Sequence, residues 1–161
     1  MISLSPIGNR NKSLLNGGLD SGRILRKGTV HSVMAENGIS SYYYSPSSII
    51  NSSLTTLTAG SAIKRGFFSN SHLFTMIRTD IEKERGRSLH FCYIPTVDTI
   101  SHKVGPYTDA TANELESIFR LISDMAEIGQ LKRNSGSVIS ADHGHTVVPP
   151  GGLIDLARER K

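Results

Sequence analysis

The chain has 161 residues, a length that fits one domain with a core of its own. Its formal net charge is +4 and its isoelectric point lies near 9.4, but the Lys and Arg residues are scattered, which indicates a solvated surface and argues against a nucleic-acid partner. No apolar run reaches the roughly 18 residues of a membrane-spanning helix, so a membrane partner is not expected either.

The cysteine content and the first residues both bear on the compartment. Cys92 is the single cysteine, which excludes an internal disulfide and fits a reducing compartment. Its place inside an apolar run predicts a packed core thiol rather than a nucleophile. The opening Met1 leads into Pro6 and Gly8 instead of a long apolar segment, so we expect no secretory signal and a cytoplasmic location.

The first half of the chain predicts an irregular start followed by short elements. Residues 1–27 carry turn signals with little periodicity and are expected to be an irregular N-terminal segment. Residues 29–37 have helical spacing, and residues 39–45, with three consecutive tyrosines, favour a strand. Residues 47–57 are ambiguous, with the apolar spacing of a weak helix. Residues 66–68 are expected to form a short apolar link.

The second half alternates clearer helices and strands. Residues 71–85 carry an apolar stripe at helical spacing, and residues 89–95 are an apolar run typical of a buried strand. The strongest helical pattern covers residues 111–128 and opens with a Thr-x-x-Glu capping box. A second apolar run, residues 137–141, predicts another strand, and residues 153–161 predict the start of a last helix.

This order of elements predicts an α/β fold. Strands alternate with helices, as parallel crossovers require, so we expect a mainly parallel sheet covered by helices within residues 28–161. In such sheets ligands bind beyond the carboxyl ends of the strands. Residues that follow the predicted strands are therefore the first candidates for a site.

Two pairs of metal-ligand residues follow the two strands predicted in the second half. Asp98 and His102 come after the first of these strands, and Asp142 and His143 come directly after the second. Carboxylate oxygen and imidazole nitrogen together suit zinc, manganese or iron, so the pattern predicts a divalent-metal site. Because Asp142 and His143 are adjacent, they can share an ion only if the strand has ended before them.

Other interpretations of these residues stay open at this point. An Asp at the end of a strand is often a turn former, and an isolated Asp-x-x-x-His pattern is weak. His145 lies two residues beyond His143. It either belongs to a solvated loop or contacts a metal-bound group or a substrate.

Two motifs resemble a known family. Residues 97–106 read Val-Asp-Thr-Ile-Ser-His-Lys-Val-Gly-Pro, and residues 140–144, after a long helix, read Ser-Ala-Asp-His-Gly. Together they resemble the type I phosphodiesterase/nucleotide pyrophosphatase family of the alkaline phosphatase superfamily, over roughly residues 29–150. The resemblance implies a three-layer αβα domain and hydrolysis of phosphodiester or pyrophosphate bonds in a nucleotide or similar small substrate.

The same resemblance implies how the site is divided. Asp98 and His102 would bind one metal ion, and Asp142 and His143 would bind a second. The family implies two divalent ions, usually Zn²⁺, with Mn²⁺ as the alternative. One ion would polarise the phosphoryl oxygen and the other would activate a nucleophile.

Some parts of the family pattern are not found in this sequence. The pattern includes an earlier Asp ligand, a Thr or Ser nucleophile that opens a helix, and a further His ligand after the Asp-His-Gly motif. Thr55 and Thr56 superficially resemble the nucleophile stretch, but they lie too close to Asp98 and no Asp-bearing strand precedes them. We therefore expect an internal fragment of a longer phosphodiesterase, an incomplete alkaline phosphatase-like domain that lacks its nucleophile.

Several functions compete with a phosphodiesterase. The chain could be a catalytically inactive fragment that only binds metal or a partner chain. A phosphomutase or sulfatase of the same superfamily is another alternative, and a nucleic-acid binder rests on net charge alone. An incomplete sheet would also expose a strand edge, so self-association through that edge is expected.

Overall fold

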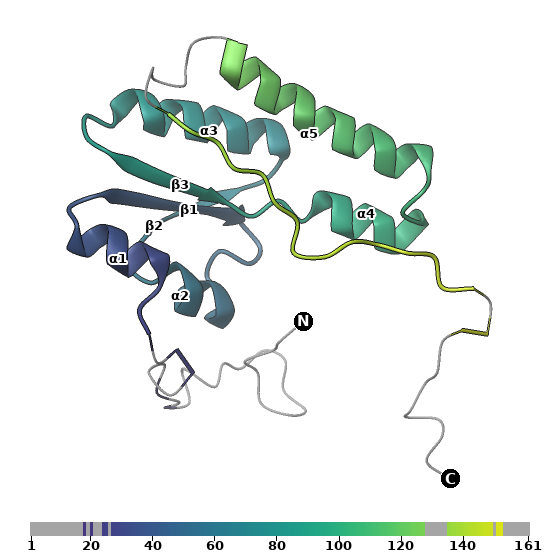
Figure 1. Ribbon diagram of the computed structural model, residues 1–161, viewed down its shortest axis with the longest axis horizontal. Coiled ribbons are helices and arrows are strands. Elements are labelled where there is room, and N and C mark those ends of the chain that lie inside the picture. Colours follow the sequence, from purple (N-terminus) through teal and green to yellow (C-terminus); the bar gives the residue numbers. More distant parts are fainter. Residues whose placement is uncertain are drawn as a thin grey trace.

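The computed structural model describes residues 18, 20, 24, 25, 27–127, 135–149, 151 and 152. In this part of the chain it shows an α/β architecture built on a three-stranded parallel sheet with the order β2-β1-β3 (Figure 1). The strands are β1 (Ser40–Pro46), β2 (Ile63–Phe67) and β3 (Ser88–Cys92). The helices are α1 (Val30–Glu36), α2 (Ser53–Ala59), α3 (Asn70–Lys83), α4 (Thr96–Val104) and α5 (Asp109–Glu127).

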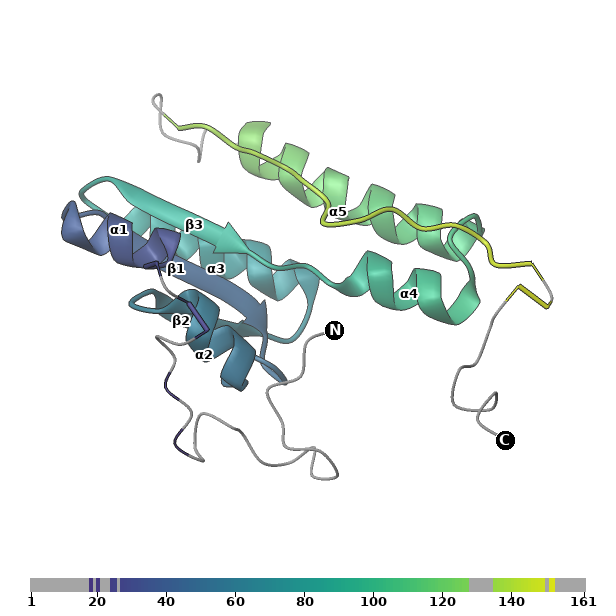
Figure 2. The same ribbon diagram turned by 60° about the horizontal axis from the view of Figure 1, so that its bottom comes forward.

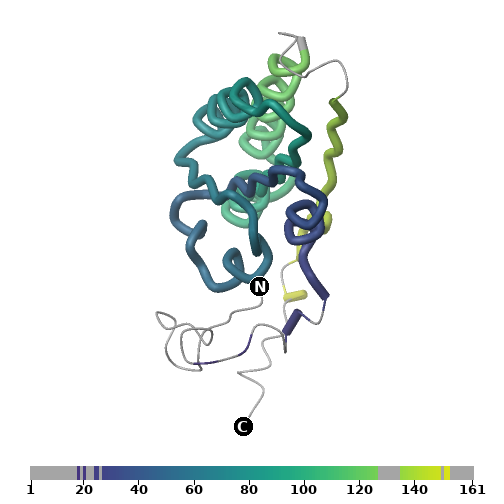
Figure 3. Tube along the Cα trace, turned by 90° about the vertical axis from the view of Figure 1, so that its left-hand side faces the viewer, coloured from purple at the N-terminus to yellow at the C-terminus, as the bar shows by residue number. Residues whose placement is uncertain are grey.

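The central strand β1 supplies side chains to both faces of the sheet. Its tyrosines alternate, so that Tyr42 and Tyr44 join one apolar cluster and Tyr43 joins another. Helices α3 and α5 lie on the face of Tyr42 and Tyr44, and α1 and α2 lie on the opposite face (Figures 2 and 3). Helix α4 lies beyond the carboxyl end of β3, where a ligand is expected in a parallel sheet (Figure 1).

A polar network joins α3 to its face of the sheet. The Tyr44 hydroxyl is buried and donates a hydrogen bond of 2.9 Å to Oδ2 of Asp80 on α3. Arg65 of β2 donates to both carboxylate oxygens of Asp80, at 3.1 and 3.2 Å. The ring of His90 on β3 stacks on Tyr42 and hydrogen-bonds the Tyr44 hydroxyl at 3.0 Å. Since buried polar groups are costly without partners, this network fixes the position of α3 on the sheet.

The opposite face is fixed by α1. The N-cap Thr29 accepts a hydrogen bond from the backbone of Ser32, which starts the helix. His31 is buried, bonds the Ser41 hydroxyl of β1 through Nδ1, and packs edge-on against Tyr43 and Phe91. Helix α1 therefore contacts both β1 and β3.

The structure confirms most of the expected elements. The helix expected over residues 29–37 is α1, and the strand expected over residues 39–45 is β1. The strand expected over residues 89–95 is β3, but it ends at Cys92 and is only partly buried, with Phe91 43% exposed. The helix over residues 71–85 is α3, capped by Ser69 rather than Ser71. The ambiguous stretch 47–57 is helical only from Ser53 onward, as part of α2.

The long helix α5 was expected, but its start differs from the prediction. It begins at Asp109, and the Thr108 hydroxyl accepts a hydrogen bond from the backbone of Thr111. Thr111 is therefore inside the first turn, and its own hydroxyl donates to the Gly105 carbonyl at 2.7 Å. The capping box predicted at Thr111 is wrong, because Thr108 fills the capping position.

Two other expectations are wrong. Residues 66–68, expected as a link, belong largely to strand β2. Residues 137–141, expected as a strand, are extended but pair with no strand of the described chain. No element was predicted for residues 96–104, which form helix α4. The predicted helix 153–161, and most of the N-terminal segment 1–27, lie outside the described residues.

Among the described helices, none combines the length and the apolar character that crossing a bilayer would need.

Candidate metal centre

Helix α4 carries the first pair of predicted ligands. It follows β3 closely, and its N-cap is Pro95, which has no side-chain capping bond. Asp98 lies in the first turn, where its negative charge interacts favourably with the helix dipole. His102 lies one turn later on the same face, with Nε2 3.3 Å from Oδ1 of Asp98. Both side chains therefore project from α4 near the carboxyl end of β3.

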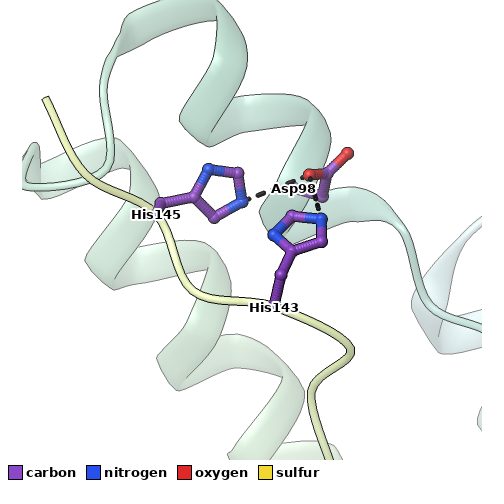
Figure 4. Close-up of side chains that lie close together, drawn as sticks. All are labelled: Asp98, His143 and His145. Atoms are coloured by element: carbon purple, nitrogen blue, oxygen red, sulfur yellow. Dashed lines mark ion pairs between the residues drawn. The ribbon is translucent and has the colours of Figure 1, made fainter. Parts of the chain in front are cut away.

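The extended segment 135–149 brings the second group of residues to α4. It passes α4 on its way toward the C-terminus, and its His143 and His145 side chains both point toward Asp98 (Figures 1 and 4). The hydroxyl of Tyr107, between α4 and α5, donates a hydrogen bond of 3.4 Å to the His145 carbonyl. The two predicted halves of the site thus meet in the structure.

One carboxylate oxygen lies at the centre of the site. Oδ1 of Asp98 is 3.2 Å from Nε2 of His145 and 3.6 Å from Nε2 of His143. The ligand atoms of Asp98, His143 and His145 all lie within 4.8 Å of one another (Figure 4). His102 approaches the same oxygen but does not belong to this group of three.

The environment of this oxygen fits a bound cation. The Asp98 side chain is 41% exposed as a whole, yet its Oδ1 atom is removed from solvent and receives no hydrogen bond of acceptable geometry. The Nε2 atoms of His102, His143 and His145 lie within ion-pair distance of it, at 3.3, 3.6 and 3.2 Å. A buried oxygen without a partner is costly, and a cation shared with two imidazole nitrogens would satisfy it. The donor set is one that zinc accepts.

The tautomer of His143 is set by its neighbour. Its Nδ1 donates a hydrogen bond of 3.0 Å to the Gly144 carbonyl, so the neutral ring keeps its lone pair on Nε2. This hydrogen bond, together with the Asp142 carboxylate, raises the pKa of His143 above its usual range. The ring thus presents Nε2 to Asp98, as a metal ligand must.

Asp142 occupies the margin of the site. Its Oδ1 lies 3.8 Å from Nε2 of His143 and also accepts a hydrogen bond of 3.1 Å from the His143 backbone. The side chain is exposed and does not belong to the group of three. The sequence required that any strand end before Asp142 and His143, and this condition is met because residues 135–149 contain no strand.

The sequence-predicted residues are therefore brought together unequally. Asp98 and His143 lie at the centre, while His102 and Asp142 flank them. His145, which the sequence left open, is the imidazole nearest to Asp98 and its side chain is only 21% exposed. A signal for it was present, since residues two apart on an extended segment project to the same side.

The nucleophile suggested superficially by Thr55 is not free. Its hydroxyl donates to the Ile49 carbonyl at 2.9 Å and is also bonded to the Ser52 hydroxyl at 3.0 Å. It therefore serves the start of α2. Among the described residues, no hydroxyl group hydrogen-bonds Oδ1 of Asp98.

Comparison of the chain with protein-family models, with curated proteins and with solved structures gave no match. One carboxylate and two imidazoles form the three-ligand set typical of a catalytic zinc site, which keeps a position for water or substrate.

Proposed function

We propose that the chain provides the metal centre of a divalent-metal-dependent hydrolase that acts on phosphodiester or pyrophosphate bonds. The observation that carries the proposal is the Oδ1 atom of Asp98, which is removed from solvent, lacks a hydrogen bond and lies 3.2–3.6 Å from Nε2 of His145 and His143. Zn²⁺ is the preferred ion for this donor set, and Mn²⁺ is the alternative.

The motif resemblance supports the reaction class. Residues 97–106 and 140–144 resemble the two metal-binding motifs of type I phosphodiesterases, and the alternating parallel architecture is compatible with an incomplete alkaline phosphatase-like domain. In that arrangement Asp98 and His102 would hold one ion, and Asp142 and His143 the other. In the structure Nε2 of His143 lies 3.6 Å from Oδ1 of Asp98 and 3.8 Å from Oδ1 of Asp142, so this single nitrogen would ligate only one of the two ions.

The chain's own residues would have distinct roles around the ions. Asp98 would supply negative charge, and the imidazoles would supply neutral nitrogen ligands, with the Gly144 carbonyl holding the His143 tautomer. A bound zinc ion would polarise a phosphoryl oxygen and lower the pKa of a bound water. The exposed sides of His102 and Asp142 leave room for a phosphate ester of a small substrate or nucleotide.

A second candidate function is binding without catalysis. The chain would then be a fragment that holds a metal ion or a partner chain and hydrolyses nothing. The arrangement of Thr55 favours it, since the hydroxyl that might have been a nucleophile is used inside α2. A site of this kind would have the same metal affinity but no turnover.

Zinc content and hydrolysis, measured on the same samples, separate the two functions. The full chain is loaded with Zn²⁺ or Mn²⁺, dialysed, and assayed for bound metal and for hydrolysis of bis(nitrophenyl) phosphate. Asp98→Asn should lose both properties, while Asp124→Asn, an exposed carboxylate on α5, should lose neither. Bound zinc without Asp98-dependent hydrolysis would leave only the metal-binding function. A chain that binds no metal would refute both.

A further inference from the structure

Residues 137–141 have a strand-like sequence but pair with none of the described strands. They are extended, and the β-branched side chains of Val138 and Ile139 are 94% and 60% exposed. Within the described residues, no backbone hydrogen bond joins this segment to the sheet. β-Branched residues favour a strand when another strand is available for pairing. The segment therefore has the sequence of a strand and lacks only the backbone pairing.

A parallel partner with a free edge lies in the same part of the molecule. Among the described strands, β3 pairs only with β1, so its other edge is open there, and the Phe91 side chain on it is 43% exposed. On the β1 side, pairing continues one residue past the strand, because the Tyr93 amide donates to the Tyr44 carbonyl at 2.9 Å. An open edge of this kind readily accepts another strand.

The segment is already oriented for parallel pairing. It crosses the molecule in the same direction as β3 (Figures 1 and 2). Its carboxyl end lies at the residues that follow β3, since Nε2 of His143 and His145 lie 3.6 and 3.2 Å from Oδ1 of Asp98. Helices α4 and α5 lie between β3 and the segment in sequence, as a parallel crossover requires.

We propose that a divalent ion bound by Asp98, His143 and His145 docks residues 137–141 on the free edge of β3 as a fourth parallel strand. The inference rests on the metal site of the proposed function and adds a structural role for the ion. Asp98 follows β3 and the histidines follow the segment, so one ion fastens together the carboxyl ends of both. Fixing one end of a segment lowers the entropy cost of pairing the rest, and metal binding is thereby coupled to folding.

Hydrogen–deuterium exchange with peptide resolution tests the docking directly. The full chain is compared with saturating Zn²⁺ and with EDTA, and bound zinc is measured in parallel. We expect zinc to slow exchange of the alternate amides in residues 137–141 that would donate to β3 by on the order of tenfold or more, as backbone pairing does. Peptides from α2, remote from the site, should exchange at the same rate in both conditions.

Two proline variants separate strand pairing from simple tethering by the ion. Adjacent residues of a strand point their N–H groups to opposite sides, so only one of Val138 and Ile139 can donate to β3. Val138→Pro and Ile139→Pro both keep the ligands and should bind zinc. One of them should abolish the zinc-dependent protection of the remaining segment amides, because proline removes a ladder donor.

The outcomes distinguish this inference from the proposed function. Bound zinc without slower exchange in residues 137–141 would overturn the docking and leave the metal centre intact. Slower exchange without hydrolysis would support the docking while removing the enzymatic function. Protection that appears only as a zinc-dependent dimer forms, seen by light scattering, would also overturn the docking, since another copy would then occupy the edge of β3. A chain that binds no zinc would refute both proposals.

Discussion

Oδ1 of Asp98 lies 3.2 Å from Nε2 of His145, closer than it lies to either of the other two imidazoles around it. His145 is also the least exposed of the three histidine side chains. The Asp98–His145 pair therefore forms the most enclosed part of the site. Distance and exposure together rank the three histidines as metal ligands, which the sequence motifs alone do not.

The first prediction follows from that order. His145→Gln should weaken zinc binding by at least about tenfold, and His102→Gln should weaken it less, because His102 lies outside the central group of three. Competition with a chromogenic zinc chelator measures the dissociation constants. His72→Gln, on α3, serves as the control and should leave the affinity unchanged, because the His72 ring contacts Phe68 and lies outside the group of three. A larger effect at His102 than at His145 would contradict the central group and favour the two-pair arrangement.

The second prediction concerns the Asp80 network. Asp80→Ala leaves the Tyr44 hydroxyl and the Arg65 guanidinium without their shared acceptor, so unfolding free energy should fall by about 2–4 kcal/mol. Tyr44→Phe removes a single hydroxyl and should cost about 1–2 kcal/mol. Urea unfolding followed by circular dichroism measures both. Asp124→Ala, an exposed acid on α5, should stay within about 0.5 kcal/mol of the parent. Equal effects at Asp80 and Asp124 would show that the network does not hold α3.

The third prediction is a pH dependence that arises from His90. Burial lowers its pKa, and the nearby charges of Asp80 and Glu84 only partly oppose this. The unfolded chain therefore takes up the proton first, near pH 6.5, so the contribution to stability is complete above that pH and is lost as the pH falls below it. His90→Phe keeps a ring against Tyr42 and should reduce this loss between pH 7 and pH 5.

Urea titrations at the two pH values, in EDTA, measure that slope. His72→Gln is again the matched control, since the half-buried His72 ring contacts Phe68 and not the His90 network. The slope of the parent chain should persist in this control. If His90→Phe retains the full slope, the pH dependence arises elsewhere.

The fourth prediction concerns the thiol of Cys92. Burial raises its pKa to about 12, so at pH 8 the thiolate fraction is very small. Reaction with a disulfide reagent in native buffer should be slower than for an unfolded cysteine by on the order of a hundredfold or more. The same sample in strong urea provides the unfolded rate. A fast native reaction would mean that the end of β3 opens frequently.

The elements that could be predicted from the sequence are those whose own residues show a clear pattern, independent of tertiary contacts. The tyrosines of β1 and the apolar face of α5 mark their elements through composition and periodicity, and Asp98 and His143 follow from their place after apolar runs. Because parallel strands gather their carboxyl ends at one edge of a sheet, the spacing of the two motifs also predicts that they meet.

The remaining elements depend on tertiary context. Strand β2 has Lys64, Arg65 and Gly66 at its centre and is held by its pairing with β1, so its own sequence shows no strand pattern. Helix α4 is rich in Thr and β-branched residues, which are weak helix formers, and it is held by packing against α5. Residues 137–141 show the reverse case, in which a strand-like sequence has no partner among the described strands.

The position of β1 between its two neighbours has a consequence for biosynthesis. β1 leaves the ribosome before either partner, and both pairings are parallel, so neither can begin as a local hairpin. One edge of β1 stays unsatisfied until residues 88–92 emerge, and every sheet contact requires closure of a loop that contains at least one helix. Folding should therefore be slower than that of a helical bundle of similar size, and the nascent chain should be most prone to aggregate just before β3 is complete.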